Sequence, residues 1–282
     1  MEQKNIAIIG VGLIGGSMAI ALKEKGIAKK IIGVDTSELH QKKALELGLV
    51  DEISGLDDAI SKSELIILAI PVDAAEELLP TILNQVDKQV VMDTGSTKQI
   101  ICELIKDHLK RKRFVATHPM WGTEYSGPEA AVKGAFENLG VIICNKEQSD
   151  FDALQLVENI YTAVRMHLLY MDAAAHDLHA AYVSHISHIT SFALANTVLE
   201  KEREDDTIFE LASTGFESTV RLAKSNPAMW VPIFMQNREN VLDVLNEHIS
   251  QLRKFKSCLE KENYEYLQEL IVNANKIRRI IR

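Results

Sequence analysis

Residues 6–22, IAIIGVGLIGGSMAIAL, form a segment of seventeen residues without a charged side chain. A secretory signal would need a basic region before this segment and a small-residue cleavage site after it. Only Lys4 precedes it, offset by Glu2, and the charged sequence KEKG follows it. A membrane-spanning helix needs about twenty apolar residues, and this segment is shorter and contains four glycines, which suit a tight turn better than a helix. We therefore predict a strand at 6–9, a glycine turn, and an amphipathic helix at about 14–25.

The glycine turn has the GxGxxG spacing of dinucleotide-binding proteins, with Gly10, Gly12 and Gly15 at the three positions. The first glycine of such a turn allows the tight bend, the second lets the backbone approach a pyrophosphate, and the third lets the helix pack closely on the strand. The pyrophosphate lies at the helix N-terminus, where free N–H groups and the helix dipole favour negative charge. Leu13 and Ile14 are accordingly expected to contact the cofactor.

Asp35 ends the second predicted strand, twenty residues after Gly15. An acid at this distance binds the ribose hydroxyls of a dinucleotide. Its carboxylate would repel a 2′-phosphate, and no arginine follows it in DTSELHQKK, so NAD is expected rather than NADP. The alternative is that Asp35 is a solvated turn residue or the N-cap of the next helix.

The rest of the chain divides near residue 171. Before it, helical patterns alternate with short β-rich segments, at 30–35, 64–71, 89–96, 113–119, 139–144 and 165–171. This alternation predicts βαβ units and a mostly parallel sheet. After it, long helical patterns replace the strand signals. We therefore expect an α/β Rossmann domain at 1–171 and an all-helical domain at 172–282.

The composition restricts the partners of the protein. A net charge of −9 argues against nucleic acid or an anionic membrane, because phosphate binding depends on clustered Lys and Arg. The three cysteines, Cys102, Cys144 and Cys258, are widely spaced and form no CxxC pair, so neither disulfides nor a zinc site is expected. The sequence thus indicates a cytoplasmic protein in a reducing compartment.

Two later strands end in polar clusters, at the sheet edge where doubly wound folds bind their ligands. VVMDTGSTK contains Ser96, and FVATHPMWGTEYSG contains His118. A histidine near a nicotinamide can accept a proton from an alcohol while hydride leaves, because its pKa lies near working pH, and a nearby serine could orient both groups. The alternative is that Ser96 caps a helix beginning at Thr97 and His118 packs against Trp121.

Residues 172–200 read as one long, largely apolar helix with a polar seam. Such a helix is expected to be buried, and buried polar groups need partners or a ligand. The residues of the seam are Asp177, Ser184, His188 and Ser191. His185 is expected at its edge, and His176 and His179 on other faces. We expect a ligand-binding seam rather than a metal site, because no HExxH pattern or facial carboxylate accompanies the histidines. Satisfied core histidines are the alternative.

The segment STVRLAKSNPAMW contains Arg221, Lys224 and Trp230. Arginine can hold a carboxylate through two parallel hydrogen bonds, and a negatively charged protein that binds an anion needs such a residue. An ordinary surface arginine on a helix is the alternative.

In their order along the chain, five motifs resemble the prephenate/arogenate dehydrogenase family. These motifs are GVGLIGGS, DTGSTK, THPMWGTEYSG, HD followed by SHxxH, and RLAKSNPxMW. The resemblance implies a Rossmann domain, a helical dimerisation domain and NAD-dependent oxidative decarboxylation of prephenate to 4-hydroxyphenylpyruvate, in tyrosine biosynthesis. It thus implies a homodimer whose substrate is prephenate or arogenate. The alternative from another class is a non-catalytic nucleotide-binding regulator that shares only the Rossmann turn.

The resemblance also implies roles for individual residues. His118 would accept the proton of the ring hydroxyl, Ser96 would bridge that hydroxyl and His118, and Arg221 would hold a substrate carboxylate. The remaining implied substrate-binding residues are His185, His188, Asp177 and Trp230. Of these, Asp177 would position Arg221, the two histidines would lie near the pyruvyl side chain, and Trp230 would close the pocket. Ser187 stands where many members have proline, which leaves the local helix path open.

Overall fold

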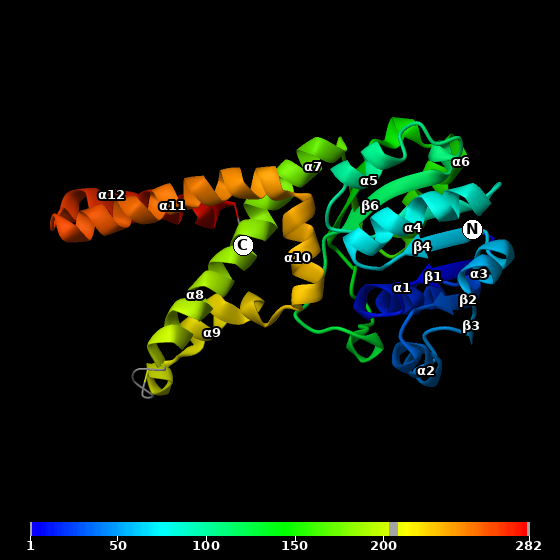
Figure 1. Cartoon of the computed structure of the whole chain (residues 1–282), viewed down its shortest axis with the longest axis horizontal. Coiled ribbons are helices and arrows are strands. Elements are labelled where there is room, and N and C mark those ends of the chain that lie inside the picture. Colours follow the sequence, from blue (N-terminus) through cyan, green and yellow to red (C-terminus); the bar gives the residue numbers. More distant parts are fainter. Residues whose placement is uncertain (1, 203–207, 281–282) are drawn as a thin grey trace. The chain divides into compact units, whose positions relative to one another are not determined.

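The computed structural model describes residues 2–202 and 208–280 (Figure 1). The chain forms two compact units, Met1–Asn237 and Arg238–Arg282. The expected domain boundary at 171–172 lies inside the first unit. The reason is that helices following the sheet pack against helices of the Rossmann half, with α7 (Ala173–Ala180) on α5 (Gln99–Leu104) and α10 (Pro227–Gln236) on α4 (Val72–Gln85).

The first unit is built on an eight-stranded sheet in the order β3-β2-β1-β4-β5-β6-β7-β8. All neighbouring strands are parallel except β6 and β7, which are antiparallel. The mostly parallel Rossmann sheet followed by helices is therefore confirmed. The strands are β1 (Lys4–Ile9), β2 (Ala28–Val34), β3 (Glu52–Ile53), β4 (Leu65–Leu68), β5 (Val90–Asp93), β6 (Phe114–Pro119), β7 (Gly140–Cys144) and β8 (His167–Met171).

Helices cover both faces of the sheet, because successive side chains of a strand point to opposite faces. In β1, Ile6 and Ile8 belong to one buried cluster, and Ala7 and Ile9 belong to the other. The helices of the first face are α1 (Leu13–Glu24), α2 (Glu38–Glu46) and α6 (Phe151–Ala163). Those of the second are α3 (Leu56–Lys62), α4 and α5. This arrangement leaves the carboxyl ends of the parallel strands β1, β2, β4, β5 and β6 along one edge.

The long helix predicted at 172–200 is present with one irregularity. α7 continues through a π-helical turn, Ala181–His185, into α8 (Ile186–Glu202). The chain then forms a 3₁₀ turn at Ile208–Leu211, α9 (Thr214–Val220), a second 3₁₀ turn at Arg221–Lys224, and α10.

The second unit is a helical hairpin. α11 (Arg238–Glu260) and α12 (Tyr264–Ala274) pack against each other, and a 3₁₀ turn, Asn275–Arg279, follows them. Among the described residues of the chain, no helix is long and apolar enough to cross a membrane.

Candidate active site

The three glycines of the turn have three different surroundings. Gly10 has φ +90°, and a Cβ there would lie 2.3 Å from the carbonyl oxygen of Ala69. A Cβ on Gly15 would lie 1.9 Å from the carbonyl oxygen of Gly10. At Gly12 the nearest atom would be 4.0 Å away, so the backbone is open to a ligand. α1 begins directly afterwards without a side-chain cap, which leaves its first N–H groups for a phosphate. These features fit the pyrophosphate of NAD.

Asp35 lies beside this turn. One carboxylate oxygen accepts the N–H of Val11 at 3.1 Å, and the other accepts the N–H of Ser37 at 2.9 Å. The N-cap of α2 is Ser37, whose hydroxyl accepts the N–H of His40. The alternative of Asp35 as the helix cap is therefore wrong. Its proximity to the glycine turn agrees with a ribose-binding role, which stays a prediction.

The polar loop after β5 is organised around a buried ion pair between Lys98 and Asp93. Asp93 also accepts the N–H of Gly95 at 2.9 Å and the N–H of Thr117 at 3.0 Å. These contacts tie the loop that carries Ser96 to the residue preceding His118 on the neighbouring strand. Burying the pair costs solvation, so its hydrogen bonds are needed to hold it in place.

Helix α5 receives its N-terminal cap from another helix. Asp177 on α7 accepts the N–H of Lys98 at 2.8 Å and that of Gln99 at 2.9 Å. α5 begins at Gln99, with Lys98 as its N-cap residue. The alternative that Ser96 caps a helix beginning at Thr97 is therefore wrong, while its role in orienting His118 stays a prediction.

His118 lies partly buried at the carboxyl end of β6 and contacts a second histidine. Its Nδ1 is 2.8 Å from Nε2 of His176, and Nδ1 of His176 is 2.7 Å from a carboxylate oxygen of Asp177. Trp121 instead packs edge-to-face on Phe136, so the alternative packing of His118 on Trp121 is wrong. Helical periodicity placed His176 outside the polar seam, and the structure adds it to the site, because its ring contacts His118.

The surroundings of His118 favour its neutral form. Burial, followed by His176, the positive charge of Lys98 and His185, lowers the pKa of His118 well below its usual value. A neutral imidazole can accept a proton. His118 is therefore a candidate base at the carboxyl edge of the sheet, the edge that also carries the cofactor-binding turn.

Two further histidines, His188 and His185, lie against Trp230. The His188 ring stacks on Trp230 with centroids 3.4 Å apart, and its Nδ1 donates to the Ser184 carbonyl at 3.1 Å. His185 is fully buried, 3.1 Å from the side-chain amide of Asn237, and burial lowers its pKa to about 4. Contact of His185, His188 and Trp230 with a substrate stays a prediction.

Arg221 pairs with Glu124, six residues after His118, at 3.0 Å. The expected positioning of Arg221 by Asp177 is wrong, because both oxygens of Asp177 are engaged with α5 and His176. The Arg221 guanidinium contributes to lowering the pKa of His188, after burial. The loop after His118, the π-turn helix and the 3₁₀ turn of Arg221 therefore meet in one region, and the exposed half of Arg221 is available to an anion.

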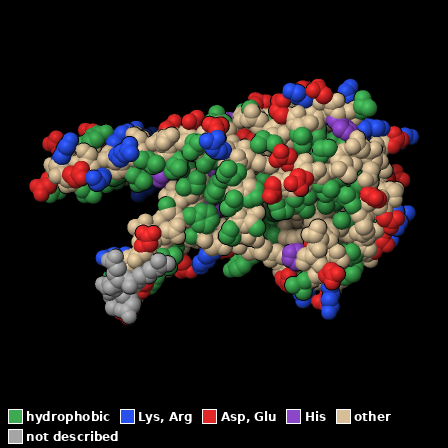
Figure 2. All heavy atoms as spheres, in the orientation of Figure 1, with side chains coloured by type: hydrophobic (Ala, Val, Ile, Leu, Met, Phe, Trp, Pro, Cys, Tyr) green, Lys and Arg blue, Asp and Glu red, His purple; other side chains and the backbone are tan. Residues whose placement is uncertain are grey.

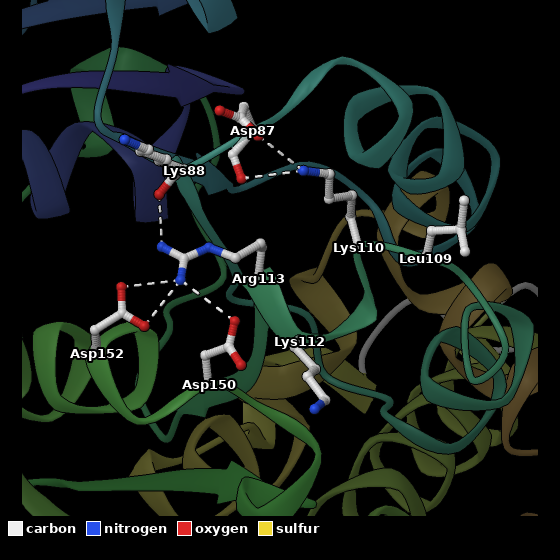
Figure 3. Close-up of a pocket in the computed structure, with 8 residues that line it drawn as sticks. All are labelled: Asp87, Lys88, Leu109, Lys110, Lys112, Arg113, Asp150 and Asp152. Atoms are coloured by element: carbon white, nitrogen blue, oxygen red, sulfur yellow. Dashed lines mark hydrogen bonds and ion pairs between the residues drawn. The ribbon is translucent and has the colours of Figure 1, made fainter.

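A surface hollow of about 360 Å³ lies elsewhere (Figure 3). It is lined by residues before β5 and β6 and at the start of α6, at the amino ends of the parallel strands. Arg113 is held there by Asp150 and Asp152, and Lys110 by Asp87 (Figure 3). Two of its four cations, Lys110 and Arg113, are paired with carboxylates, and the hollow lies at the edge opposite His118, so we do not assign the substrate to it.

The fold and the nucleotide-binding turn place the protein among the NAD-dependent dehydrogenases. More particularly, the chain belongs to the prephenate dehydrogenase family. Residues 18–170 match the family model for the nucleotide-binding domain of prephenate dehydrogenase, and residues 172–273 match the model for its dimerization domain. The glycine turn lies before the first match and is supported by its own geometry.

Characterised relatives agree with this assignment. The chain is 32% identical to the prephenate dehydrogenase of Bacillus subtilis over 98% of this chain and 76% of that protein. It is 30% identical to the cyclohexadienyl dehydrogenase of Zymomonas mobilis over 98% and 95% of the two chains. The crystal structure of prephenate dehydrogenase from A. aeolicus with hydroxyphenyl propionate and NAD+ superposes with a TM-score of 0.91 at 30% identity, over 100% of this chain and 99% of that chain.

Proposed function

We propose that this protein oxidatively decarboxylates prephenate to 4-hydroxyphenylpyruvate with reduction of NAD, a step of tyrosine biosynthesis. The observation that carries this proposal is the imidazole of His118, which is anchored by His176 at the carboxyl edge of the sheet, the edge that also carries the nucleotide-binding turn. The similarity to a structure that holds hydroxyphenyl propionate and NAD+ supports the same substrate class.

The residues supply what this reaction needs. The glycine turn and Asp35 would hold NAD, which would supply the hydride acceptor for C4 of the substrate ring. His118 takes the proton of the C4 hydroxyl, and loss of the C1 carboxylate as carbon dioxide restores the aromatic ring. Arg221 binds a carboxylate of the substrate through its fork of N–H donors. The protein thus contributes orientation, charge and one proton acceptor.

Arogenate is the alternative substrate, with an amine in place of the keto group. It would need an acidic group for its ammonium. Both oxygens of Asp177 already accept backbone N–H groups, and one of them also contacts His176. Asp177 is therefore not available to an amine. Glu217, the other acid that could serve, is exposed, so the choice between the two substrates depends on the kinetic comparison.

We further propose that the protein acts as a homodimer. Apolar side chains are exposed on α10 and α8, including Val231, Met235 and Leu199. Figure 2 shows hydrophobic side chains gathered over α10 and the neighbouring part of α8. A contiguous apolar surface of this kind marks an interaction site, and the segment matches a family model for dimerization.

The test of the substrate is a kinetic comparison. We expect NADH formation, followed by absorbance, with a higher kcat/KM for prephenate than for arogenate and for NAD than for NADP. A higher value for arogenate would transfer the assignment to that substrate. No turnover of either would refute the proposed function.

A further inference from the structure

We propose that His176 is a positioning residue that sets the tautomer of His118, with Asp177 fixing His176 in turn. The inference rests on the proposed function for its kinetic consequences, but its structural content can be tested without a substrate. The three side chains form one line of contacts, from Asp177 through His176 to His118, with separations of 2.7 Å and 2.8 Å.

The direction of the two hydrogen bonds follows from the role of Asp177 as an acceptor. Asp177 accepts two backbone N–H groups, so it acts toward His176 as an acceptor, and Nδ1 of His176 must carry a proton. In a neutral imidazole the other nitrogen is then an acceptor. Nε2 of His176 therefore receives the Nδ1–H of His118, and Nε2 of His118 is left with a lone pair.

This assignment makes His118 a base at one defined atom. The opposite tautomer would place the proton on Nε2 and leave no lone pair for the substrate hydroxyl. A similar arrangement, in which a buried aspartate orients a histidine, is the established logic of the serine protease triad. Here a second histidine lies between the acid and the base.

The groups that act on His118 come from several elements. His176 contacts it from α7, while Lys98, in the loop after β5 and paired with Asp93, and His185, in the π-helical turn, contribute to lowering its pKa. His176 and Asp177 are each 1% exposed, so water does not compete for their hydrogen bonds. Asp177 also caps α5, so the same carboxylate holds the loop that carries Ser96.

Two substitutions separate positioning from packing. His176→Gln retains an acceptor near the place of Nε2 but loses the ring, whereas His176→Phe retains the ring and loses the acceptor. If His176 sets the tautomer, kcat should fall about tenfold or less in the glutamine variant and about 100-fold or more in the phenylalanine variant, with KM nearly unchanged in both. If the ring only fills space, the order is reversed, and that result would overturn the proposal.

Asp172→Ala is the matched control. The Asp172 side chain caps the same helix α7 through the N–H of Ala175, but it does not contact His176. Its loss should lower the melting temperature by several degrees and leave kcat within twofold. A loss of kcat equal to that of the His176 variants would show that helix stability, not the tautomer, is responsible.

A spectroscopic measurement tests the assignment independently of activity. In protein labelled with ¹⁵N-histidine, at pH 8 and without substrate, Nδ1 of His118 should be protonated and Nε2 unprotonated, with the His118→Asn spectrum identifying the signals. A proton on Nε2 would overturn the proposal. Should the phenylalanine variant not fold, this measurement decides. Should the wild-type protein oxidise neither substrate, the proposed function fails while the tautomer is still tested.

Discussion

At the scale of the residue, the position of His118 depends on groups from distant parts of the chain. Asp93 and Lys98 organise the neighbouring loop, and His176 with Asp177 holds the ring. Each of these groups is nearly inaccessible to solvent. The imidazole is therefore held in place before a substrate arrives, which is a recognised source of catalytic rate.

His118→Asn should lower kcat by about 10²- to 10⁴-fold, the usual contribution of a general base. The melting temperature should change little, because the substitution is small and His118 is only partly buried. His108→Asn is the control, since His108 lies before β6, at the opposite edge of the sheet, and should keep full activity. An unchanged rate in the His118 variant would remove it from the chemistry.

The pH profile should reflect the lowered pKa of His118. The lowering from the ordinary value of 6.5 means that the ring stays unprotonated, and able to accept a proton, to a lower pH than a free histidine. We therefore expect kcat/KM to fall on the acid side only below pH 6.5. The measurement is kcat/KM against pH at saturating NAD, and an acid limb centred at or above pH 6.5 would contradict the assignment.

The sequence was sufficient to place His118 at the end of a strand but not to identify its contact with His176. His118 follows a strand and precedes a proline and two glycines. This local pattern indicates a residue at the end of a strand, beside a tight loop. His176 had to be placed by helical periodicity, and its partner lies 58 residues away. The π-helical turn at Ala181–His185 adds a residue to one turn, so 100° steps no longer relate Asp177 to His188. The adjacency of His176 and Asp177 in the sequence was the available signal that an acid could orient this histidine.

At the scale of the element, the strand–turn–helix of β1 and α1 shows how the fold builds the cofactor site. Gly10 and Gly15 are required by the backbone packing, whereas a Cβ at Gly12 would make only an ordinary contact, 4.0 Å from the nitrogen of Gly127. Packing therefore explains the glycine at two of the three positions, and at Gly12 we predict that close approach of the cofactor explains it. This difference can be measured.

Gly15→Ala should lower the free energy of unfolding by at least about 1–3 kcal/mol, the usual effect of overpacking, because the new methyl group meets the backbone of Gly10. Gly12→Ala should fold normally, since the φ of −75° at Gly12 suits alanine, but its Kd for NAD should rise about tenfold or more. Thermal unfolding and NAD titration separate the two. Equal loss of stability in both variants would show that Gly12 is also structural.

The elements themselves were largely predictable. All seven strands expected from apolar segments are present, because parallel strands buried on both faces are continuously hydrophobic. Their expected ends ran into polar tails such as Thr94–Ser96, which leave the sheet to form the site. β3, of two residues, is too short to give a periodic signal.

At the scale of the whole molecule, the chain separates into compact units at Asn237 rather than at the end of the sheet. The change from strands to helices near residue 171 was visible in composition. The packing of α10 on α4 was not, because it depends on the contact of Val72 with Trp230 and Ile233, residues far apart in sequence. Local patterns identify elements, whereas tertiary contacts determine which elements form a unit.

The exposed apolar face of α10 gives the test of assembly. Val231 and Met235 are four residues apart on one face, with exposures of 57% and 63%. In a monomer, replacing both with glutamate should cost little, since surface substitutions usually change stability by about 0.5 kcal/mol or less. In a dimer that covers this face, the two carboxylates would be buried without partners, which is strongly unfavourable.

We expect light scattering to give twice the chain mass of 31.5 kDa for the wild type and the single mass for the double variant. Leu109→Glu, on a side chain that is 98% exposed, should leave the dimer intact, and a wild-type monomer at micromolar concentration would contradict the proposed assembly.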